Sequence, residues 1–335
     1  MMSDSRWLIV LINIAAMFTV IVVGWVARRR SFLTAETTGA LSRFIVDIAL
    51  PALVLSSMIN TVDTAQLKAN WFLPLLGGAI MIVGQVVGFL TMPLFAKREQ
   101  WPTFTFLVAT ANWIYLPLPI ATALYGPEGE RAVILFNIGA QVVLWTALVA
   151  GLQRQKLSAE SLKNLVLNPG LVATVGGILL ALLFPDLRIL AVRDTASPTA
   201  LSAIARIFQT ALVTVGSLTI PLSMVVIGAQ LGGLRFGEHR PSRALAGVLL
   251  ARLFIVPAAT ISLVLFLERC GIRIAEAPRV VAYLIAAMPV AVSCSMFTER
   301  FGGDTSFAAR SIFYSTLLSA ITVPLIFFLI QKAGF

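Results

Sequence analysis

The chain has 335 residues, of which 59% are hydrophobic and only 12% are charged, and its mean hydropathy is +0.93. Soluble domains carry about 25% charged residues, so this composition excludes an ordinary soluble domain and indicates a polytopic membrane protein. The formal net charge of +10 is, in such a protein, more typical of positive loops that face the cytoplasm than of a nucleic-acid partner.

Apolar runs of about 20 residues predict ten membrane-spanning helices within an all-α fold. The first has no A-x-A-like cleavage site and is predicted to be an uncleaved span. Gly126 is expected to end the fourth span, Asn168-Pro169 to start the sixth, and Asp304 with its neighbours to cap the tenth. The predicted spans are residues 7–27, 38–59, 70–95, 102–125, 129–152, 164–184, 204–232, 243–267, 279–300 and 306–331.

The distribution of lysine and arginine predicts how the chain is oriented. If the loop after the first span lies inside, most of the Lys and Arg residues fall on the inner side, and the bias is clearest in the short early loops, such as Arg28-Arg29-Arg30. Short cytoplasmic loops carry this excess in membrane proteins. We therefore expect a multi-pass protein of the cell inner membrane with both termini outside.

Two predicted spans contain proline where the helix should cross the membrane. The first reads "ATANWIYLPLPIATALYGPEGERA", with Pro117 and Pro119, and the second reads "AAMPVAVSCSMFTERFGGDTSFAA", with Pro289. Proline removes a backbone donor and breaks or kinks a helix. Within a membrane, a non-helical backbone is tolerated only where it is buried in protein or lines a cavity. Such interruptions at matching positions of two halves point to the binding site of a secondary transporter.

Similar segments recur about half a chain length apart. "ALPALVLSSM" with Pro51 is echoed by "TIPLSMVVIGAQL" with Pro221, and "YGPEGERAVILF" is echoed by "FGGDTSFAARSIF". We interpret the chain as one membrane domain built from two five-helix repeats, residues 1–155 and 164–335. An odd number of spans in each repeat inverts the second relative to the first. The alternative is chance similarity between apolar sequences.

Residues that suit enzyme chemistry are scarce. The two cysteines, Cys270 and Cys294, have no metal or redox spacing, and His239 is the only histidine. The sequence contains no H-E-x-x-H, G-x-x-x-x-G-K-[ST] or G-x-S-x-G motif. We therefore predict that the protein is not an enzyme, binds no metal and needs no cofactor.

Five segments in order resemble the auxin efflux carrier family, which includes bacterial malate and malonate permeases and is related to plant auxin carriers. They are "VDIALPALVLSSM", "NWIYLPLPIATALYGPEG", "LVLNPGLVATVGGILLALLFP", "IPLSMVVIGAQL" and "AAMPVAVSCSMFTERFGGD". The resemblance implies a ten-helix fold shared with bile-acid/sodium symporters, with a scaffold panel and a transport core. It further implies broken fourth and ninth helices that cross near the membrane centre, organic-anion substrates and an elevator-like movement of the core. The long cytoplasmic loop of some plant members is absent.

The substrate-binding candidates flank the two breaks. Asn112 matches the family's asparagine before the crossover proline, and an amide suits a carboxylate; alternatively, it satisfies the backbone of its own broken helix. Small hydroxyls after the second break either bind substrate or let helices pack closely. Gln230, near Pro221, is a secondary candidate. The full set is Asn112, Tyr115, Pro117, Pro289, Ser293, Ser295 and Gln230.

Two charged residues lie deep enough in predicted spans to suggest function, since such charges are costly in a membrane. Asp47 in the second span and Arg252 in the eighth are candidates for coupling or gating. They could form an ion pair, or Arg252 could pair with a substrate carboxylate; a static pair and a snorkelling arginine are the structural alternatives. Protons through Asp47, or sodium through oxygens at the breaks, are the coupling ions considered.

The sequence thus predicts a secondary active transporter of small organic anions, such as malonate, malate or auxin-like acids, with the substrate at the crossing of the fourth and ninth spans. A membrane ligand sensor or scaffold is the alternative from another class, and a passive channel is a third. The expected partners are the anion and the lipid bilayer. A homodimer formed through the panel is suggested by related folds.

Overall fold

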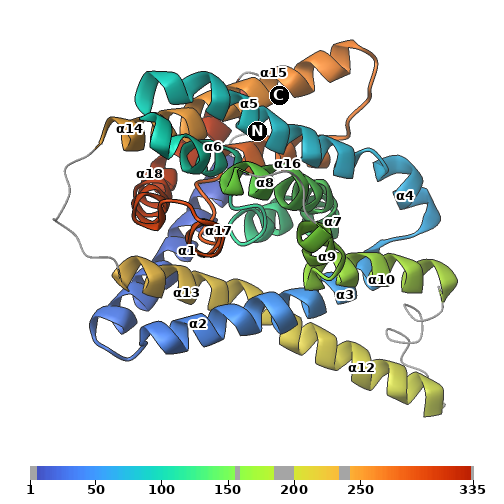
Figure 1. The fold of residues 1–335 in the computed structure, drawn as a ribbon. Helices are drawn as coiled ribbons and strands as arrows, with labels where there is room; N and C mark the ends of the chain where they lie inside the picture. The colour runs from blue at the N-terminus through green and yellow to red at the C-terminus, as the bar shows by residue number, and fades with distance from the viewer. Residues whose placement is uncertain (1–5, 155–158, 185–199, 234–241, 333–335) are drawn as a thin grey trace. The chain divides into compact units, whose positions relative to one another are not determined.

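The computed structural model describes residues 6–154, 159–184, 200–233 and 242–332, and within them the regular secondary structure is helical, with one isolated β-bridge (Figure 1). Seven helices in this part are long and apolar enough to cross a membrane. An all-helical membrane protein is therefore confirmed. The seven are Leu11–Arg29, Ala35–Thr61, Thr64–Phe95, Pro117–Gln153, Ala203–Gly233, Arg243–Arg269 and Thr305–Lys332.

The other three predicted spans, the fourth, sixth and ninth, consist of shorter helices. The sixth corresponds to α10 (Pro169–Leu183), an apolar helix of 15 residues. The fourth and ninth are interrupted where proline was expected to break them. Gly126 lies at a sharp kink inside α7 (Pro117–Val143), with φ 56° and ψ −139°, a conformation that favours glycine. The predicted boundary between the fourth and fifth spans is thus a kink.

The predicted helix caps are confirmed in atomic detail. The side-chain oxygen of Asn168 accepts a hydrogen bond from the backbone N–H of Leu171 (3.0 Å), with Pro169 as the first residue of α10. Asp304 accepts in the same way from Phe307 (2.8 Å) at the start of α18 (Thr305–Lys332). Both bonds satisfy backbone donors that a helix leaves free at its N-terminus.

The described residues divide into two compact units, and each unit combines stretches from both halves of the chain. We call the first the crossover unit: Met1–Thr19, Leu73–Leu165 and Gly233–Phe335. Its helices are the start of α1 (Arg6–Arg29), α5 (Leu73–Phe95), η2 (Arg98–Gln100), α6 (Trp101–Ala109), α7, η3 (Leu144–Leu148), α8 (Val149–Gln153), α9 (Ala159–Val166), α14 (Arg243–Leu250), η4 (Ala251–Ile255), α15 (Val256–Arg269), α16 (Glu276–Ala287), α17 (Cys294–Phe301) and α18.

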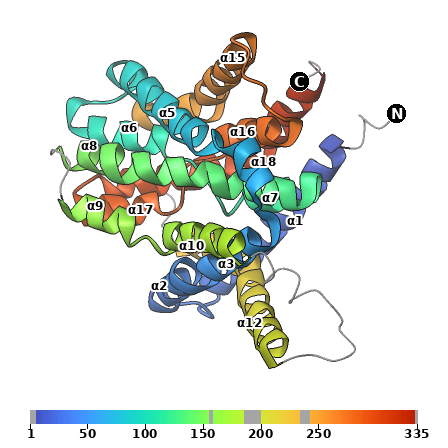
Figure 2. The same ribbon diagram turned by 90° about the vertical axis from the view of Figure 1, so that its right-hand side faces the viewer.

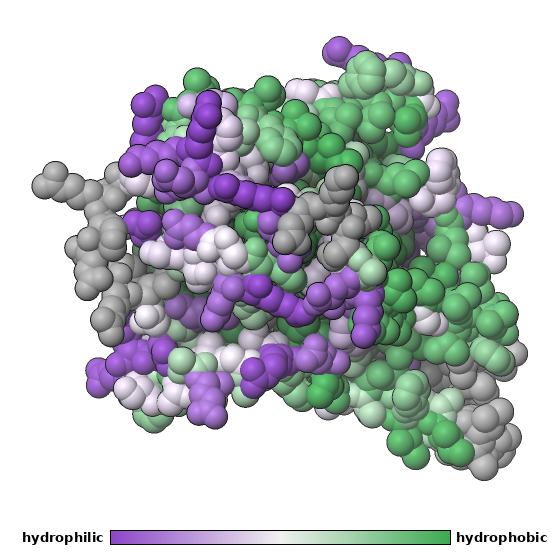
Figure 3. All heavy atoms as spheres, in the orientation of Figure 1, coloured by the Kyte–Doolittle hydropathy of each residue, from purple (hydrophilic) through white to green (hydrophobic). Residues whose placement is uncertain are grey.

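The second unit comprises Val20–Phe72 and Val166–Gly232. Within it α3 packs against α10 and α12, and Figure 2 shows α10 alongside α3. Apolar side chains cover the outer side of α12 (Figure 3), as lipid-facing helices require. Its elements are the rest of α1, α2 (Ala35–Phe44), η1 (Ile45–Ala49), α3 (Leu50–Thr61), α4 (Thr64–Asn70), α10, α12 (Ala200–Ser217) and α13 (Thr219–Gly233).

The core of the crossover unit is held by helices in direct backbone contact. α5 packs along α7, where a side chain at Gly139 would overlap the carbonyl oxygen of Pro74 and one at Gly77 would overlap that of Phe136. Close approach through small residues is the usual basis of helix association in membranes, where no hydrophobic force drives it. This packing supports the two interrupted helices described next.

Candidate functional site

Two helices of the crossover unit stop in the middle and resume after a short non-helical segment. α6 ends at Ala109 and α7 begins at Pro117; α16 ends at Ala287 and α17 begins at Cys294. We call residues 110–116 and 288–293 together the crossover. Pro117 opens α7 and Pro289 lies within the second segment, and both are buried. Proline therefore stands at both interruptions, as predicted from its missing N–H.

The two segments of the crossover pair with one another in an antiparallel arrangement. Ala111 and Val290 form the bridge. The backbone N–H of Asn112 donates to the carbonyl of Pro289 (2.9 Å), and that of Ala291 donates to the carbonyl of Thr110 (3.0 Å). Unpaired backbone groups cost several kcal/mol in a membrane interior, so each break supplies partners for the other.

A serine on a third helix satisfies one further backbone donor. The N–H of Val290 donates to Oγ of Ser315 on α18 (3.2 Å), and both groups are buried. Ser315 was not among the predicted site residues. A serine in a membrane helix usually donates a hydrogen bond within its own helix, as Ser315 also does to the carbonyl of Ile312 (3.2 Å). No feature of the sequence around Ser315 therefore indicates its contact with Val290.

Arg252 joins the ends of both interrupted helices. Its Nε donates to the carbonyl of Met288 (3.0 Å) and its Nη1 to that of Val108 (3.1 Å), while Nη2 donates to that of Ala286. The side chain is 1% exposed and lies in the π-helical turn η4. A helix leaves its last carbonyls without partners, and a cation is favoured there. The guanidinium thus caps the C-terminal ends of α6 and α16 together.

The other predicted coupling residue, Asp47, belongs to the second unit. It is an exposed residue of the π-helical turn η1 in the second unit. The bonds of Arg252 run to backbone carbonyls of the crossover unit, and an Asp47–Arg252 pair remains a prediction. π-helical turns often mark functional sites, and both residues occupy one.

Asn112 is buried and bonded to its own chain. Its Oδ1 accepts from the backbone N–H of Tyr115 (3.0 Å), which organises the turn that leads into α7. Among the described residues, its Nδ2 has no hydrogen-bond partner. Two neighbouring side chains carry buried polar atoms without a partner in the same part of the chain, Oγ1 of Thr110 and Nε1 of Trp113. Buried polar atoms of this kind call for an explanation such as a ligand or water.

The serines of the second break lie at the start of α17. Ser293 is half-buried in the N-cap position and its side chain makes no capping bond, whereas Oγ of Ser295 donates to the carbonyl of Val292 (3.0 Å). Gln230 is on α13 in the second unit, and its buried Oε1 has no partner among the described residues. No group of three or more His, Cys, Asp and Glu residues in the described segments is placed to hold a metal ion.

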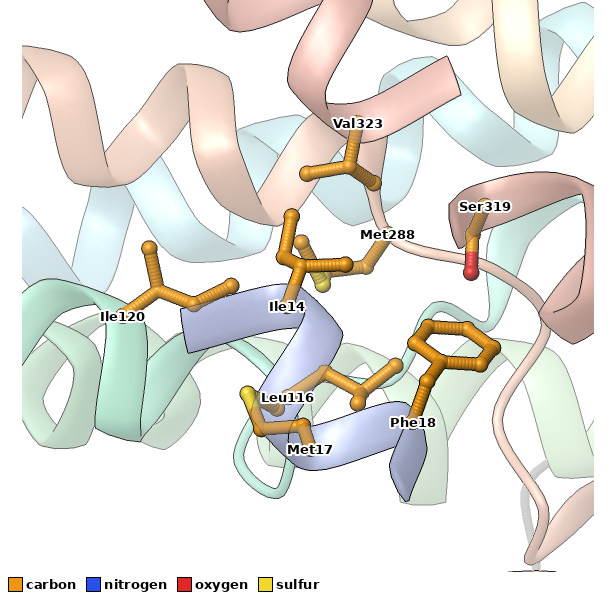
Figure 4. Close-up of a pocket in the computed structure, with 8 residues that line it drawn as sticks. All are labelled: Ile14, Met17, Phe18, Leu116, Ile120, Met288, Ser319 and Val323. Atoms are coloured by element: carbon orange, nitrogen blue, oxygen red, sulfur yellow. The ribbon is translucent and has the colours of Figure 1, made fainter. Parts of the chain in front are cut away.

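A small apolar pocket adjoins the crossover. Met288 and Leu116, one from each broken segment, form part of its wall, and Ser319 contributes the one hydroxyl. Figure 4 shows side chains of α1, α7 and α18 pointing toward the same space. It is lined by Ile14, Met17, Phe18, Leu116, Ile120, Met288, Ser319 and Val323. The residues of α1 in this wall were not among the predicted site residues.

Comparison with known proteins agrees with this geometry. The model of the membrane transport protein family matches residues 9–161 and 153–327. A protein of Methanothermobacter thermautotrophicus described as an uncharacterized transporter is 26% identical over 326 residues, covering 93% of this chain and 96% of the relative. The match spans nearly the whole chain, both breaks included, and confirms the resemblance described above. The chain belongs to the membrane transport protein family, that of the auxin efflux carriers.

Proposed function

We propose that this membrane transporter is a secondary active carrier of small organic anions and that the anion binds at the crossover. The observation that carries the proposal is the pairing of two interrupted helices in the buried interior of one unit. Discontinuous helices of this kind form the substrate sites of many transporter folds. Mono- and dicarboxylates are the substrate class that family membership favours.

Two helix N-termini at the crossover present local positive charge to an anion. α7 and α17 both begin at the crossover, and a helix N-terminus carries partial positive charge and free N–H donors. Pro117 and Pro119 have no N–H, so the first turn of α7 offers few donors. The first turn of α17 contains no proline; the N–H groups of Cys294 and Ser295 donate to the carbonyls of Ala291 (3.0 Å) and Val292 (3.4 Å), so the helix end offers its partial charge and the serine hydroxyls. We therefore expect the carboxylate to bind at the start of α17, near Ser293 and Ser295, with Asn112 and Tyr115 on the opposite segment.

The proposed mechanism is an elevator. Each unit combines stretches from both halves of the chain, as expected if two inverted repeats each supply a panel part and a core part. The crossover unit would be the moving core and the second unit the panel, with Gln230 a secondary substrate ligand. Protons through Asp47, or sodium through oxygens at the breaks, would drive the cycle. Outside termini, an inner-membrane location and a panel-mediated homodimer belong to the same proposal.

A binding screen on purified protein tests the substrate class. Thermal shift is recorded with malonate, malate, succinate and indole-acetate, with and without sodium, at two pH values. A ligand that binds the folded state raises apparent stability by mass action, by about 2.7 kcal/mol at a concentration of 100 Kd. We expect a shift with at least one acid that Asn112→Ala abolishes. A shift produced only by cations or neutral solutes contradicts the organic-anion proposal.

Asn168→Ala is the matched control for this screen. Asn168 accepts from the backbone N–H three residues on at 3.0 Å, as Asn112 does, but it caps α10 in the second unit. Both substitutions remove the same kind of bond, so a general loss of stability should appear in both. Loss of the ligand-induced shift in Asn112→Ala alone assigns that residue to the site.

Transport by the reconstituted protein separates the carrier from the other two candidate functions. Labelled acid is loaded on one side of proteoliposomes and unlabelled acid on the other. A carrier accelerates uptake of label when counter-substrate is present, because the loaded site returns faster, whereas a passive channel shows no such trans-stimulation. A sensor or scaffold binds the acid and moves none of it.

A further inference from the structure

We propose that the positive charge of Arg252 makes the crossover selective for anions. Arg252 acts through space from the C-terminal ends of α6 and α16 and does not contact the anion. This inference rests on the proposed transport of organic anions. The observation behind it is the arrangement of three hydrogen bonds from one guanidinium to Val108, Ala286 and Met288, which lie at the ends of two different helices.

A count of charges at the crossover shows why Arg252 matters. Two helices end there, α6 and α16, and two begin there, α7 and α17. Each C-terminus carries about −0.5 of an elementary charge and each N-terminus about +0.5, so the four ends together nearly cancel. Arginine keeps its charge when buried. With Arg252 the crossover has a net charge of about +1, and without it the net charge is near zero.

The acidic side chains on the surrounding elements do not neutralise this charge. η4 packs against α5, α6, α14, α15, α16 and α18, and the acids on these helices are Glu268 and Glu276. Glu268 forms a salt bridge with Arg279 (3.2 Å), and Glu276 accepts a hydrogen bond from Tyr125 (3.2 Å). Both lie near helix ends, remote in sequence from the breaks. On α7 and α17, which begin at the crossover, the acids are Glu128, Glu130 and Glu299; Glu128 and Glu299 are exposed and Glu130 is half-buried. The acids of these described helices thus leave the positive charge at the crossover for a substrate.

The burial of Arg252 decides between a direct and an indirect role. Its side chain is 1% exposed, and it is not among the residues that line the pocket beside the crossover. Three bonds to carbonyls hold the planar group in place, which a lysine with its single nitrogen cannot reproduce. Its charge therefore acts on the anion through space, in an environment of low dielectric constant where a charge acts at longer range.

The test compares each acid with its neutral amide, which has nearly the same shape. The probes are indole-acetate with indole-acetamide, and malonate with malonamide, and the readout is the ratio of their affinities for purified full-length protein at pH 7. We expect the wild-type protein to prefer the acid. Arg252→Gln should lower the acid:amide ratio roughly 10- to 30-fold, the effect of a unit charge about 8 Å away at an effective dielectric constant of about 20, and leave amide affinity nearly unchanged.

Arg279→Gln is the matched control, because it removes an arginine from α16 that pairs with Glu268 away from the crossover. It should leave the ratio unchanged. If Arg252→Gln weakens acid and amide equally, Arg252 is only structural and the inference is overturned. The same follows if the preference for the acid survives intact. A wild-type protein that binds no acid, or prefers the amide, overturns the proposed function itself and the inference with it.

A second measurement applies if Arg252→Gln does not fold. Arg252→Lys keeps a charge near the same place but makes it easier to remove, because burial favours the neutral form of a lysine more readily than that of an arginine. Between pH 7 and pH 9.5 the acid:amide ratio should fall more steeply in Arg252→Lys than in the wild-type protein. A ratio that follows pH identically in both proteins contradicts a role for the charge.

Discussion

At the scale of single residues, the crossover is built from side chains that replace missing backbone partners. The amide oxygen of Asn112 accepts from the N–H of Tyr115, Ser315 accepts from Val290, and Arg252 donates to three carbonyls. In the low dielectric of a membrane each unpaired group is costly. The side chains that permit the breaks are therefore as necessary to the crossover as those that we propose to meet the substrate.

Ser315→Ala is predicted to destabilise the protein by about 1–3 kcal/mol, the cost of leaving the buried N–H of Val290 without a partner. Chemical unfolding in detergent measures the loss, and hydrogen exchange at the Val290 amide should accelerate. Ser319→Ala is the control, because Ser319, one turn further along α18, bonds only within its own helix, to Thr316 (2.7 Å). Equal effects of the two substitutions contradict this account of Ser315.

At the scale of elements, the crossover unit depends on helices that touch through their backbones. α5 and α7 meet where glycine leaves no side chain between them, at Gly77 and Gly139. α7 carries one side of the crossover at its start, so its position against α5 fixes the position of the break. The contact also leaves little room for sliding between the two helices.

Gly139→Ala is accordingly predicted to destabilise the protein by more than about 2 kcal/mol, because the added methyl overlaps the carbonyl oxygen of Pro74 and the helices must separate. Gly151→Ala on α8 is the control: nothing lies within 4 Å of the added carbon, and alanine favours helix by up to about 1 kcal/mol. Thermal unfolding followed by size-exclusion chromatography compares them. A Gly139 variant as stable as the wild-type protein would show that the two helices can adjust.

The breaks themselves were predictable, whereas the contacts that hold them together were not. Pro117 and Pro289 mark the interruptions through a local rule, the missing N–H, and Asn168 and Asp304 mark helix starts by another. The bond between Arg252 and Val108 joins residues 144 positions apart, and no local pattern carries it. The cost of a charge in a membrane marked Arg252 as a candidate, with Asp47, a substrate carboxylate or the interface as its possible partners, whereas its three carbonyl partners come from distant parts of the chain.

At the scale of the whole molecule, the two compact units interleave along the chain. Residues 20–72 and 166–232 form one, and the flanking stretches form the other. Interleaving means that the halves of the sequence are not the halves of the structure. A chain cut at its midpoint would separate α6 from α16 and thereby split the crossover between the two fragments.

The two cysteines provide a test of orientation. Cys270, at the end of α15, is exposed, and Cys294 is buried. With both termini outside, Cys270 is also outside, so a membrane-impermeant maleimide should label it in intact spheroplasts, and Cys270→Ser should remove the signal. Cys294 should react only after denaturation. Labelling of Cys270 only in permeabilised spheroplasts would reverse the proposed orientation.

The guanidinium bound to both helix ends has an electrical consequence for the proposed cycle. Moving one elementary charge through a potential of 100 mV changes its energy by about 2.3 kcal/mol. Arg252 is hydrogen-bonded to α6 and α16, so its charge travels wherever those helices travel. A core that holds a monovalent anion is close to neutral overall, whereas an empty core remains cationic. The membrane potential then acts mainly on the return of the empty carrier. It favours the position of the empty core in which the site opens toward the negative side of the membrane.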